Sequence, residues 1–198
     1  MENKLKEKII EEIIWTCTKQ GAFQRSYIYK TGILITNEDK EKLRNHIKDF
    51  CRFNLFNLPV NVALSENELL SIIENLCNTT ASNFGKILNN DEFQFGNAQK
   101  FINLYLKMLW VLGRIGFPPH FPVDRIIQKR IISKKTIPWT NMNKKEYLSV
   151  IESAKRLAEI ENLSLAEWEA GDFAEFDHPV SDQTDHHQPE QIDHLVSD

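Results

Sequence analysis

The chain has 198 residues, of which 41% are hydrophobic and 26% are charged. This length indicates one globular domain, or one domain with appendages, and no stretch approaches the ~20 uninterrupted apolar residues that a membrane-spanning helix needs. Residues 1–8 are charged and lack the apolar core of a secretory signal, so we expect a cytoplasmic protein with no membrane partner. Cys17, Cys51 and Cys77 have no zinc-binding spacing, and we interpret them as reduced thiols.

The charges divide the chain into a basic body and an acidic tail. All 24 Lys and Arg residues precede residue 157, and the first 165 residues carry a formal charge of +6 although the whole chain carries −4. From residue 166 onward there are ten acidic residues and no basic one. A basic body suggests a polyanionic partner, whereas an ordinary solvated surface explains the same count equally well.

Apolar residues at helical spacing predict an all-α globular domain over residues 1–170. The helices are expected over residues 2–18 and 38–52, from Ser65, from Asn97 to about Leu112, from about Val123 to Ile132, from Asn143, and from Ser164. The pairs Ser65 and Glu68, Asn143 and Glu146, and Ser164 and Glu167 have the spacing of helix-opening capping boxes. Residues 25–35 predict a short hairpin or an extended linker, and the polar stretch 78–94 predicts a loop.

The last segment, residues 171–198, has the composition of a disordered acidic tail. The dipeptide Asp-His recurs every eight residues from Asp177, and four of the six histidines lie here. His and Asp side chains suit divalent ions, but the segment lacks the apolar content to fold a site. The sequence therefore favours disorder and predicts no metal site or cofactor, with a metal-binding tail, or an acidic tail that competes with a polyanion for the basic body, as the alternatives.

The helix expected from Asn97 to Leu112 is apolar around most of its circumference, which is typical of a buried helix. Lys100, Asn103 and Lys107 share one narrow stripe on it. A lysine in buried surroundings loses hydration, which favours its neutral, nucleophilic form. The alternative is that this stripe simply faces solvent.

A Gly- and Pro-rich turn follows that helix, and Asp124 is expected in the first turn of the next one, where the helix dipole stabilises a carboxylate. Alternatively, Asp124 serves only that helix. Positions 114–145 hold eight cations against this single acid, a density that would attract a phosphate backbone. The nucleic-acid-binding candidates among them are Arg114, Arg125, Lys129, Arg130, Lys134 and Lys135. Trp110, Phe121 and Trp139 are candidates for stacking on a base, although each residue type is more common in a core.

These residues resemble the helix-hairpin-helix DNA glycosylases, most closely the archaeal 8-oxoguanine DNA glycosylase/lyase branch. In that family a helix carries two lysines seven residues apart, and a Pro-Val-Asp tripeptide follows downstream. The corresponding residues here are Lys100, Lys107 and Pro122-Val123-Asp124. The similarity covers roughly residues 95–140, and the Leu-Pro-Gly-x-Gly hairpin signature of the superfamily is absent. An uncharacterised bacterial family with the same layout is the alternative.

The resemblance implies a compact helix-hairpin-helix-like fold and a DNA base-excision activity without a metal or organic cofactor. Lys100 would attack the sugar C1′ and form a Schiff base, and Asp124 would take the lysine proton and stabilise the developing charge. Lys107 would contact phosphate or act as the alternative nucleophile. The damaged base and the oligomeric state are not specified by the sequence.

Two other functions fit the sequence. A noncatalytic nucleic-acid-binding or defence-type regulatory module would use the same cations on one exposed face, without a pocket. A helical protein-interaction domain would expose an apolar patch instead. The enzyme hypothesis requires Lys100 and Asp124 to share one concave site with the amine partly buried.

Overall fold

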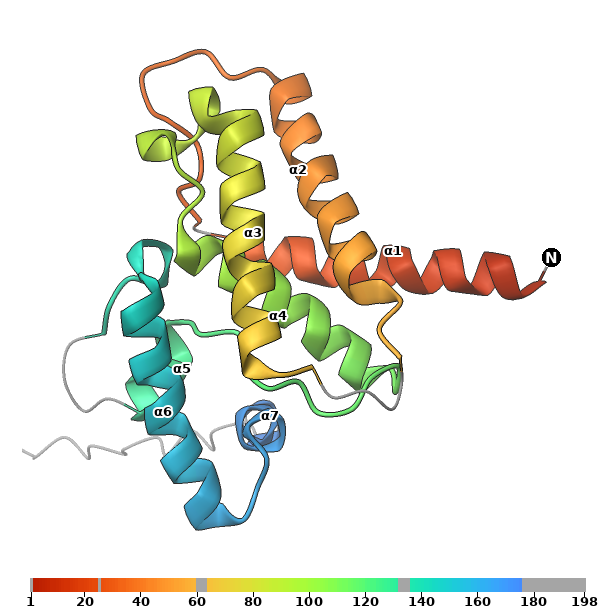
Figure 1. Cartoon of the computed structure of the whole chain (residues 1–198), viewed down its shortest axis with the longest axis vertical. Coiled ribbons are helices and arrows are strands. Elements are labelled where there is room, and N and C mark those ends of the chain that lie inside the picture. The colour runs from red at the N-terminus through yellow and green to blue at the C-terminus, as the bar shows by residue number, and fades with distance from the viewer. Residues whose placement is uncertain (1, 25, 60–63, 132–135, 176–198) are drawn as a thin grey trace, which may run out of the picture.

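The computed structural model describes residues 2–24, 26–59, 64–131 and 136–175. Within these ranges the chain forms seven α-helices and no named strand, which confirms the predicted all-α class (Figure 1). The helices are α1 (Glu2–Phe23), α2 (Asn37–Cys51), α3 (Glu66–Phe84), α4 (Phe95–Val111), α5 (Arg125–Ile131), α6 (Lys144–Glu161) and α7 (Leu165–Glu175). A π-helical segment follows α2, and three short 3₁₀ turns, η2 (Gly85–Ile87), η3 (Asn89–Asp91) and η4 (Trp139–Asn141), lie between the later helices. Among the described residues, no helix has the length and apolarity needed to cross a bilayer.

All three predicted capping boxes open helices. Ser65 and Asn143 accept hydrogen bonds from the backbone N–H groups of Glu68 and Glu146, whose carboxylates accept in return from the cap N–H groups. Ser164 and Glu167 make the same exchange at the start of α7. Each box satisfies N–H groups that a helix start would otherwise leave without a partner.

The predicted stop of α4 at Gly113 is also confirmed. Gly113 adopts φ +67, its N–H donates to the Trp110 carbonyl, and the N–H of Arg114 donates to the Leu109 carbonyl. This is the Schellman arrangement, in which a left-handed residue reverses the chain and satisfies the last carbonyls.

Several predicted boundaries were wrong. Helix α1 continues beyond residue 18 to Phe23. The loop expected within residues 78–94 is present, and it lies between the end of α3 at Phe84 and the start of α4 at Phe95. Of the two alternatives predicted for residues 25–35, the described residues 26–35 form the linker and no hairpin, and Tyr29 makes an isolated antiparallel bridge with Leu88. Helix α4 begins at Phe95, so Asn97 lies buried in its first turn and does not cap it. Helix α7 runs on to Glu175, across the domain boundary expected at residue 170, whereas the tail residues 176–198 lie outside the described residues.

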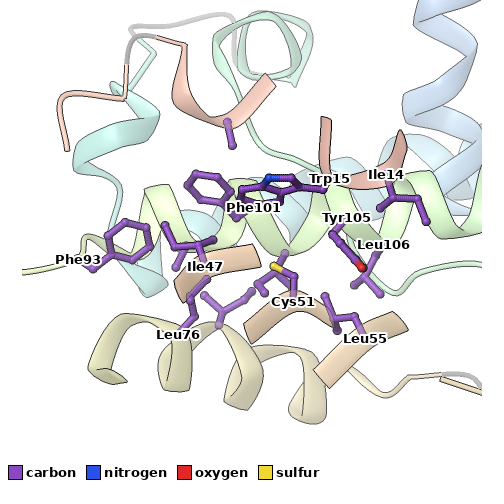
Figure 2. Packing of buried hydrophobic residues seen from close by; sticks show 14 of the residues in the cluster. Ile14, Trp15, Ile47, Cys51, Leu55, Leu76, Phe93, Phe101, Tyr105 and Leu106 are labelled. Atoms are coloured by element: carbon purple, nitrogen blue, oxygen red, sulfur yellow. The ribbon is translucent and has the colours of Figure 1, made fainter. Parts of the chain in front are cut away.

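Two groups of buried apolar residues build the molecule. The first, the N-terminal core, joins α1, α2, α3 and α4 around residues such as Trp15, Ile47, Leu76 and Phe101 (Figure 2). The second, the C-terminal core, joins α5, α6 and α7 around residues such as Tyr147 and Trp168.

Helix α4 lies between the two cores. Eleven of its 17 residues are buried, which confirms the burial expected from its apolar circumference. Its apolar residues Phe101, Tyr105 and Leu106 belong to the N-terminal core, whereas its polar residues face the segments that lead into the C-terminal core. Figure 1 shows α5, α6 and α7 together on one side of the α1–α4 group. The functional candidates of α4 therefore lie at the junction of the two halves.

Candidate functional site

Lys100 and Asp124 meet at this junction. The Lys100 Nζ lies 3.1 Å from Asp124 Oδ2, and the lysine is 8% exposed. The side chain of Asp124 is 28% exposed, so the amine is shielded while its carboxylate partner reaches the surface. The stripe on α4 therefore does not face solvent at Lys100.

Asp124 is fixed by the start of α5. Its Oδ1 accepts hydrogen bonds from the backbone N–H groups of Ile126 at 2.9 Å and Ile127 at 3.1 Å. Asp124 thus occupies the N-cap position immediately before α5. The sequence had predicted a position one step later, in the first turn of the helix. One carboxylate oxygen holds the helix start, and the other remains directed at Lys100.

Gln99 binds the backbone just before Asp124. Its Nε2 donates to the Val123 carbonyl at 2.9 Å, and its Oε1 accepts from the Val123 N–H at 3.1 Å. Gln99 and Val123 are both 0% exposed. Consecutive residues of α4, Gln99 and Lys100, therefore hold the consecutive residues Val123 and Asp124, which fixes the register between the helix and the loop.

Trp139 covers the lysine from a third direction. The Lys100 Nζ lies 5.1 Å from the centroid of the Trp139 ring, within the range of a cation–π contact. Trp139 comes close because α4 carries a glycine where η4 crosses it. A Cβ atom on Gly96 would lie 1.7 Å from the Trp139 carbonyl oxygen.

The second lysine of the stripe has a different carboxylate partner. Lys107 Nζ lies 2.6 Å from Glu169 Oε2 of α7, and Glu169 is 3% exposed. The two lysines of α4 thus make separate ion pairs two turns apart. Lys107 ties α4 to α7, whereas Lys100 ties it to the start of α5.

A chain of buried polar groups continues from Gln99 into the C-terminal core. Asn103 Nδ2 donates to Gln99 Oε1 at 3.2 Å and to the Tyr147 hydroxyl at 2.9 Å. That hydroxyl lies 2.9 Å from Nδ1 of His120, whose Nε2 lies 3.7 Å from the Glu66 carboxylate. Burial lowers the pKa of His120 to about 4 and raises the pKa of Tyr147 above its usual range. Both groups are therefore neutral at pH 7, and the network is held by neutral hydrogen bonds.

The predicted phosphate-binding cations do not form one free face. Arg114 makes two hydrogen bonds to Glu7, and Arg130 stacks 4.4 Å from the Trp168 ring centroid and donates to the Trp168 carbonyl. Arg125 and Lys129 are both exposed on α5, four residues and so about one helical turn apart. Lys134 and Lys135 lie outside the described residues.

The three stacking candidates also differ. Phe121 is 2% exposed and packs 6.1 Å from Trp168, so its ring belongs to the C-terminal core and has no free face for a base. Trp110 is partly buried against Phe117. Trp139, also partly buried, is the only one of the three in contact with the candidate lysine.

A hollow of about 460 Å³ lies at the start of α4, lined in part by Glu74, Phe93, Phe95 and Asn143. Lys100 and Asp124 do not line it. Among the described residues, no group of three or more His, Cys, Asp or Glu side chains could hold a metal ion. The Asp-His repeats lie in residues 176–198, outside that description.

The sequence pattern marks Lys100 and Asp124 but points to no role for Gln99, Gly96 or His120. A glutamine beside the candidate lysine on a buried helix was the available signal for Gln99. Nothing in the sequence marks Gly96, because the atom that requires it belongs to Trp139, 43 positions later.

Comparisons with models of protein families, with curated proteins and with solved structures each gave no match.

Proposed function

We propose that the chain is a DNA glycosylase/AP lyase that removes a damaged or modified base through a Schiff base on Lys100. One observation carries the proposal: a largely buried lysine amine 3.1 Å from a surface-reaching carboxylate, with an aromatic ring over it. An activated lysine needs shielding from water and an adjacent group that takes its proton. Lys100 has both, and no metal or organic cofactor is needed for the reaction.

The first step is a proton transfer within the pair. The Lys100 ammonium gives a proton to the Asp124 carboxylate, which leaves a neutral amine and a carboxylic acid. The amine lone pair then attacks the sugar C1′ while the C1′–N bond breaks, and the base leaves with that electron pair and takes the proton from Asp124. The Asp124 carboxylate, again ionised, stabilises the positive charge that develops on the sugar.

Ring opening completes the Schiff base. Asp124 takes a proton from the nitrogen now bonded to C1′, the nitrogen lone pair forms the C1′=N bond, and the ring oxygen O4′ leaves carbon and accepts that proton. The Asp124 carboxylate, ionised again, then takes a proton from C2′, the C2′–H electron pair forms a C2′=C3′ bond, and the 3′ phosphate departs with the C3′–O electrons. Water finally hydrolyses the imine and frees Lys100.

DNA binding at this site would use cations close to Asp124. Arg125 follows Asp124 directly, and Lys129 lies one turn further along α5, both exposed. Lysine and arginine side chains beside the reacting pair would hold the phosphates of an extruded nucleotide. Trp139 is the aromatic candidate for contacting the base.

Borohydride trapping tests the proposal directly. The protein is mixed with labelled duplexes that contain an abasic site, 8-oxoguanine or only normal bases, and hydride then reduces any imine to a stable amine. We expect a covalent adduct with a damaged duplex that disappears in Lys100→Ala. Lys107→Ala is the matched control, because it removes another ion-paired lysine from the same helix and is expected to keep the adduct.

Three results would overturn the assignment. Loss of the adduct in Lys107→Ala alone would make Lys107 the nucleophile. An adduct retained in both variants would place the chemistry on another amine. No adduct with any duplex would remove the lyase activity, and a salt-sensitive gel shift in the same samples would then favour the noncatalytic DNA-binding module.

A further inference from the structure

Helix α1 is attached to the molecule over only part of its length. Its C-terminal half packs on α4 through Ile14, Trp15 and Ala22, which are buried in the N-terminal core. Its N-terminal half extends away from the other helices (Figure 1). At 1.5 Å per residue, the 22-residue helix is about 33 Å long.

Ion pairs on one side hold the projecting half in place. Glu7 pairs with Arg114 at 2.7 Å, and Glu11 lies 3.7 Å from Arg52. These contacts orient the helix and decide which of its faces is turned to solvent.

The solvent face of this half is apolar. Leu5, Ile9 and Ile13 follow one another at four-residue intervals and are 62%, 50% and 48% exposed. Together with Lys8 and Glu12 they line a shallow groove of about 500 Å³. We call the three apolar residues the α1 stripe. Three large apolar side chains in one row are more typical of a contact surface than of a solvated helix, where such residues occur singly.

We propose that the α1 stripe is the docking surface for a second copy of this chain, with the two α1 helices antiparallel. The charges beside the stripe favour this occupant. The groove carries the cation Lys8 one helical turn before the anion Glu12, and Lys4 lies one turn before Lys8. The Glu12 carboxylate pairs with Lys48 of its own chain at 2.5 Å but is 52% exposed, so it can also face a lysine of the second copy.

Reversing a second copy places the basic start of each helix beside the acidic middle of the other. Two-fold symmetry then repeats every favourable contact. A parallel pair would instead place like charges together, which is unfavourable along facing helices.

The stripe is short, and this sets the expected strength. The groove along it, from Leu5 to Cys17, spans about 18 Å of helix, so a helix pair of this length buries less than the ~800 Å² per partner of a standard interface. The dimer is therefore expected to be weak and concentration-dependent. It is independent of the proposed enzyme activity.

Sedimentation of the full chain over about 5 to 500 μM, the range in which weak dimers form, tests the proposal. We expect the average mass to rise from monomer toward dimer, and Ile9→Glu to lower the association constant at least about tenfold. Ile160→Glu is the matched control. It introduces the same charge at another exposed isoleucine, on α6, where Ile160 is 76% exposed, and is expected to leave the association unchanged.

Charge reversal tests the antiparallel arrangement. The two variants are Lys8→Glu and a double variant, Glu12→Lys with Lys48→Glu, which keeps the in-chain ion pair with its charges exchanged. Each should weaken self-association, whereas an equimolar mixture of the two should recover dimer, because one groove is then acidic and the other basic. A wild-type chain that stays monomeric throughout overturns the proposal, as does a dimer that Ile9→Glu does not weaken. Failure of the mixture to recover dimer overturns the antiparallel pairing.

Discussion

The two sides of α4 contact the molecule through different chemistry. Toward α1, α2 and α3, its buried side chains are apolar, and Phe101 packs edge-on against Phe23 at 4.8 Å between ring centroids. Toward the C-terminal half, Gln99, Lys100 and Asn103 are buried, and each has a specific polar partner. The apolar side tolerates small shifts because dispersion and burial are not directional. The polar side requires its partners at fixed distances, because an unpartnered buried polar group is costly.

Stability and the proposed chemistry therefore depend on different residues of one helix. Substitutions on the apolar side should lower stability without a specific effect on Lys100. Substitutions on the polar side should cost less stability and change the geometry of the Lys100–Asp124 pair. Five measurements test this separation.

Phe101→Ala should have the largest effect. Phe101 is 0% exposed, and its removal leaves a cavity among Trp15, Phe23 and Phe93. We expect the free energy of unfolding to fall by about 4 kcal/mol in urea titration. A loss below about 1 kcal/mol would show that the N-terminal core is not packed as described.

Gly96→Ala should come next, on the polar side. The new Cβ would meet the Trp139 carbonyl oxygen at 1.7 Å, and the obstacle is backbone, so η4 must move. We expect a loss of about 3 kcal/mol, at the upper end of overpacking effects. Gly171→Ala is the matched control. It lies on α7 with open space around its Cβ position, and alanine there should stabilise the protein by up to ~1 kcal/mol.

The stability should also depend on pH through His120. Burial lowers its pKa from 6.5 to about 4, whereas in the unfolded chain the imidazole titrates near 6.5. Between these values the unfolded state binds more protons, so the stabilisation is complete above pH 6.5 and is lost as the pH falls toward 4. The loss is on the order of 3 kcal/mol. Urea titrations at several pH values should show a slope in this window that is reduced in His120→Asn. Equal slopes in both proteins would contradict a buried neutral His120.

Gln99→Ala should cost about 2 kcal/mol, because it leaves the buried N–H and carbonyl of Val123 without partners. Gln128 is its matched control, since Gln128 makes the same pair of hydrogen bonds to the backbone of Ile137. Both Gln→Ala variants should lose similar stability. Only Gln99→Ala should slow single-turnover borohydride trapping strongly, about tenfold or more, because it releases the segment that carries Asp124. Equal slowing in both variants would reduce Gln99 to a structural role.

Lys100→Met should have the smallest effect on stability. Methionine fills the space of the lysine side chain although it loses the contact of Nζ with the Trp139 ring, and the partly exposed Asp124 retains its two backbone hydrogen bonds at the start of α5. We expect a change below about 1 kcal/mol together with complete loss of the trapped adduct. A large loss of stability would show that the pair serves the fold.

Local sequence determined the all-α class, the capping boxes at Ser65, Asn143 and Ser164, and the stop at Gly113. These features depend on residues within one or two turns, so their physical causes are present in a short stretch of chain. Helix burial was also readable for α4, because apolar residues cover most of its circumference. The predicted end of α1 at residue 18 was wrong because tertiary packing extends a helix beyond its local signals.

Only the tertiary structure decided the site. The sequence proposed Lys100 and Asp124 as partners, but 24 residues separate them, and their 3.1 Å contact depends on how the segment after Gly113 folds back onto α4. The same folding placed Phe121 in a core, paired Arg114 with Glu7 and gave Lys107 the partner Glu169. Each of these side chains contacts a residue far away in the sequence. Which residue it contacts depends on the position of whole helices and not on the local pattern of residues.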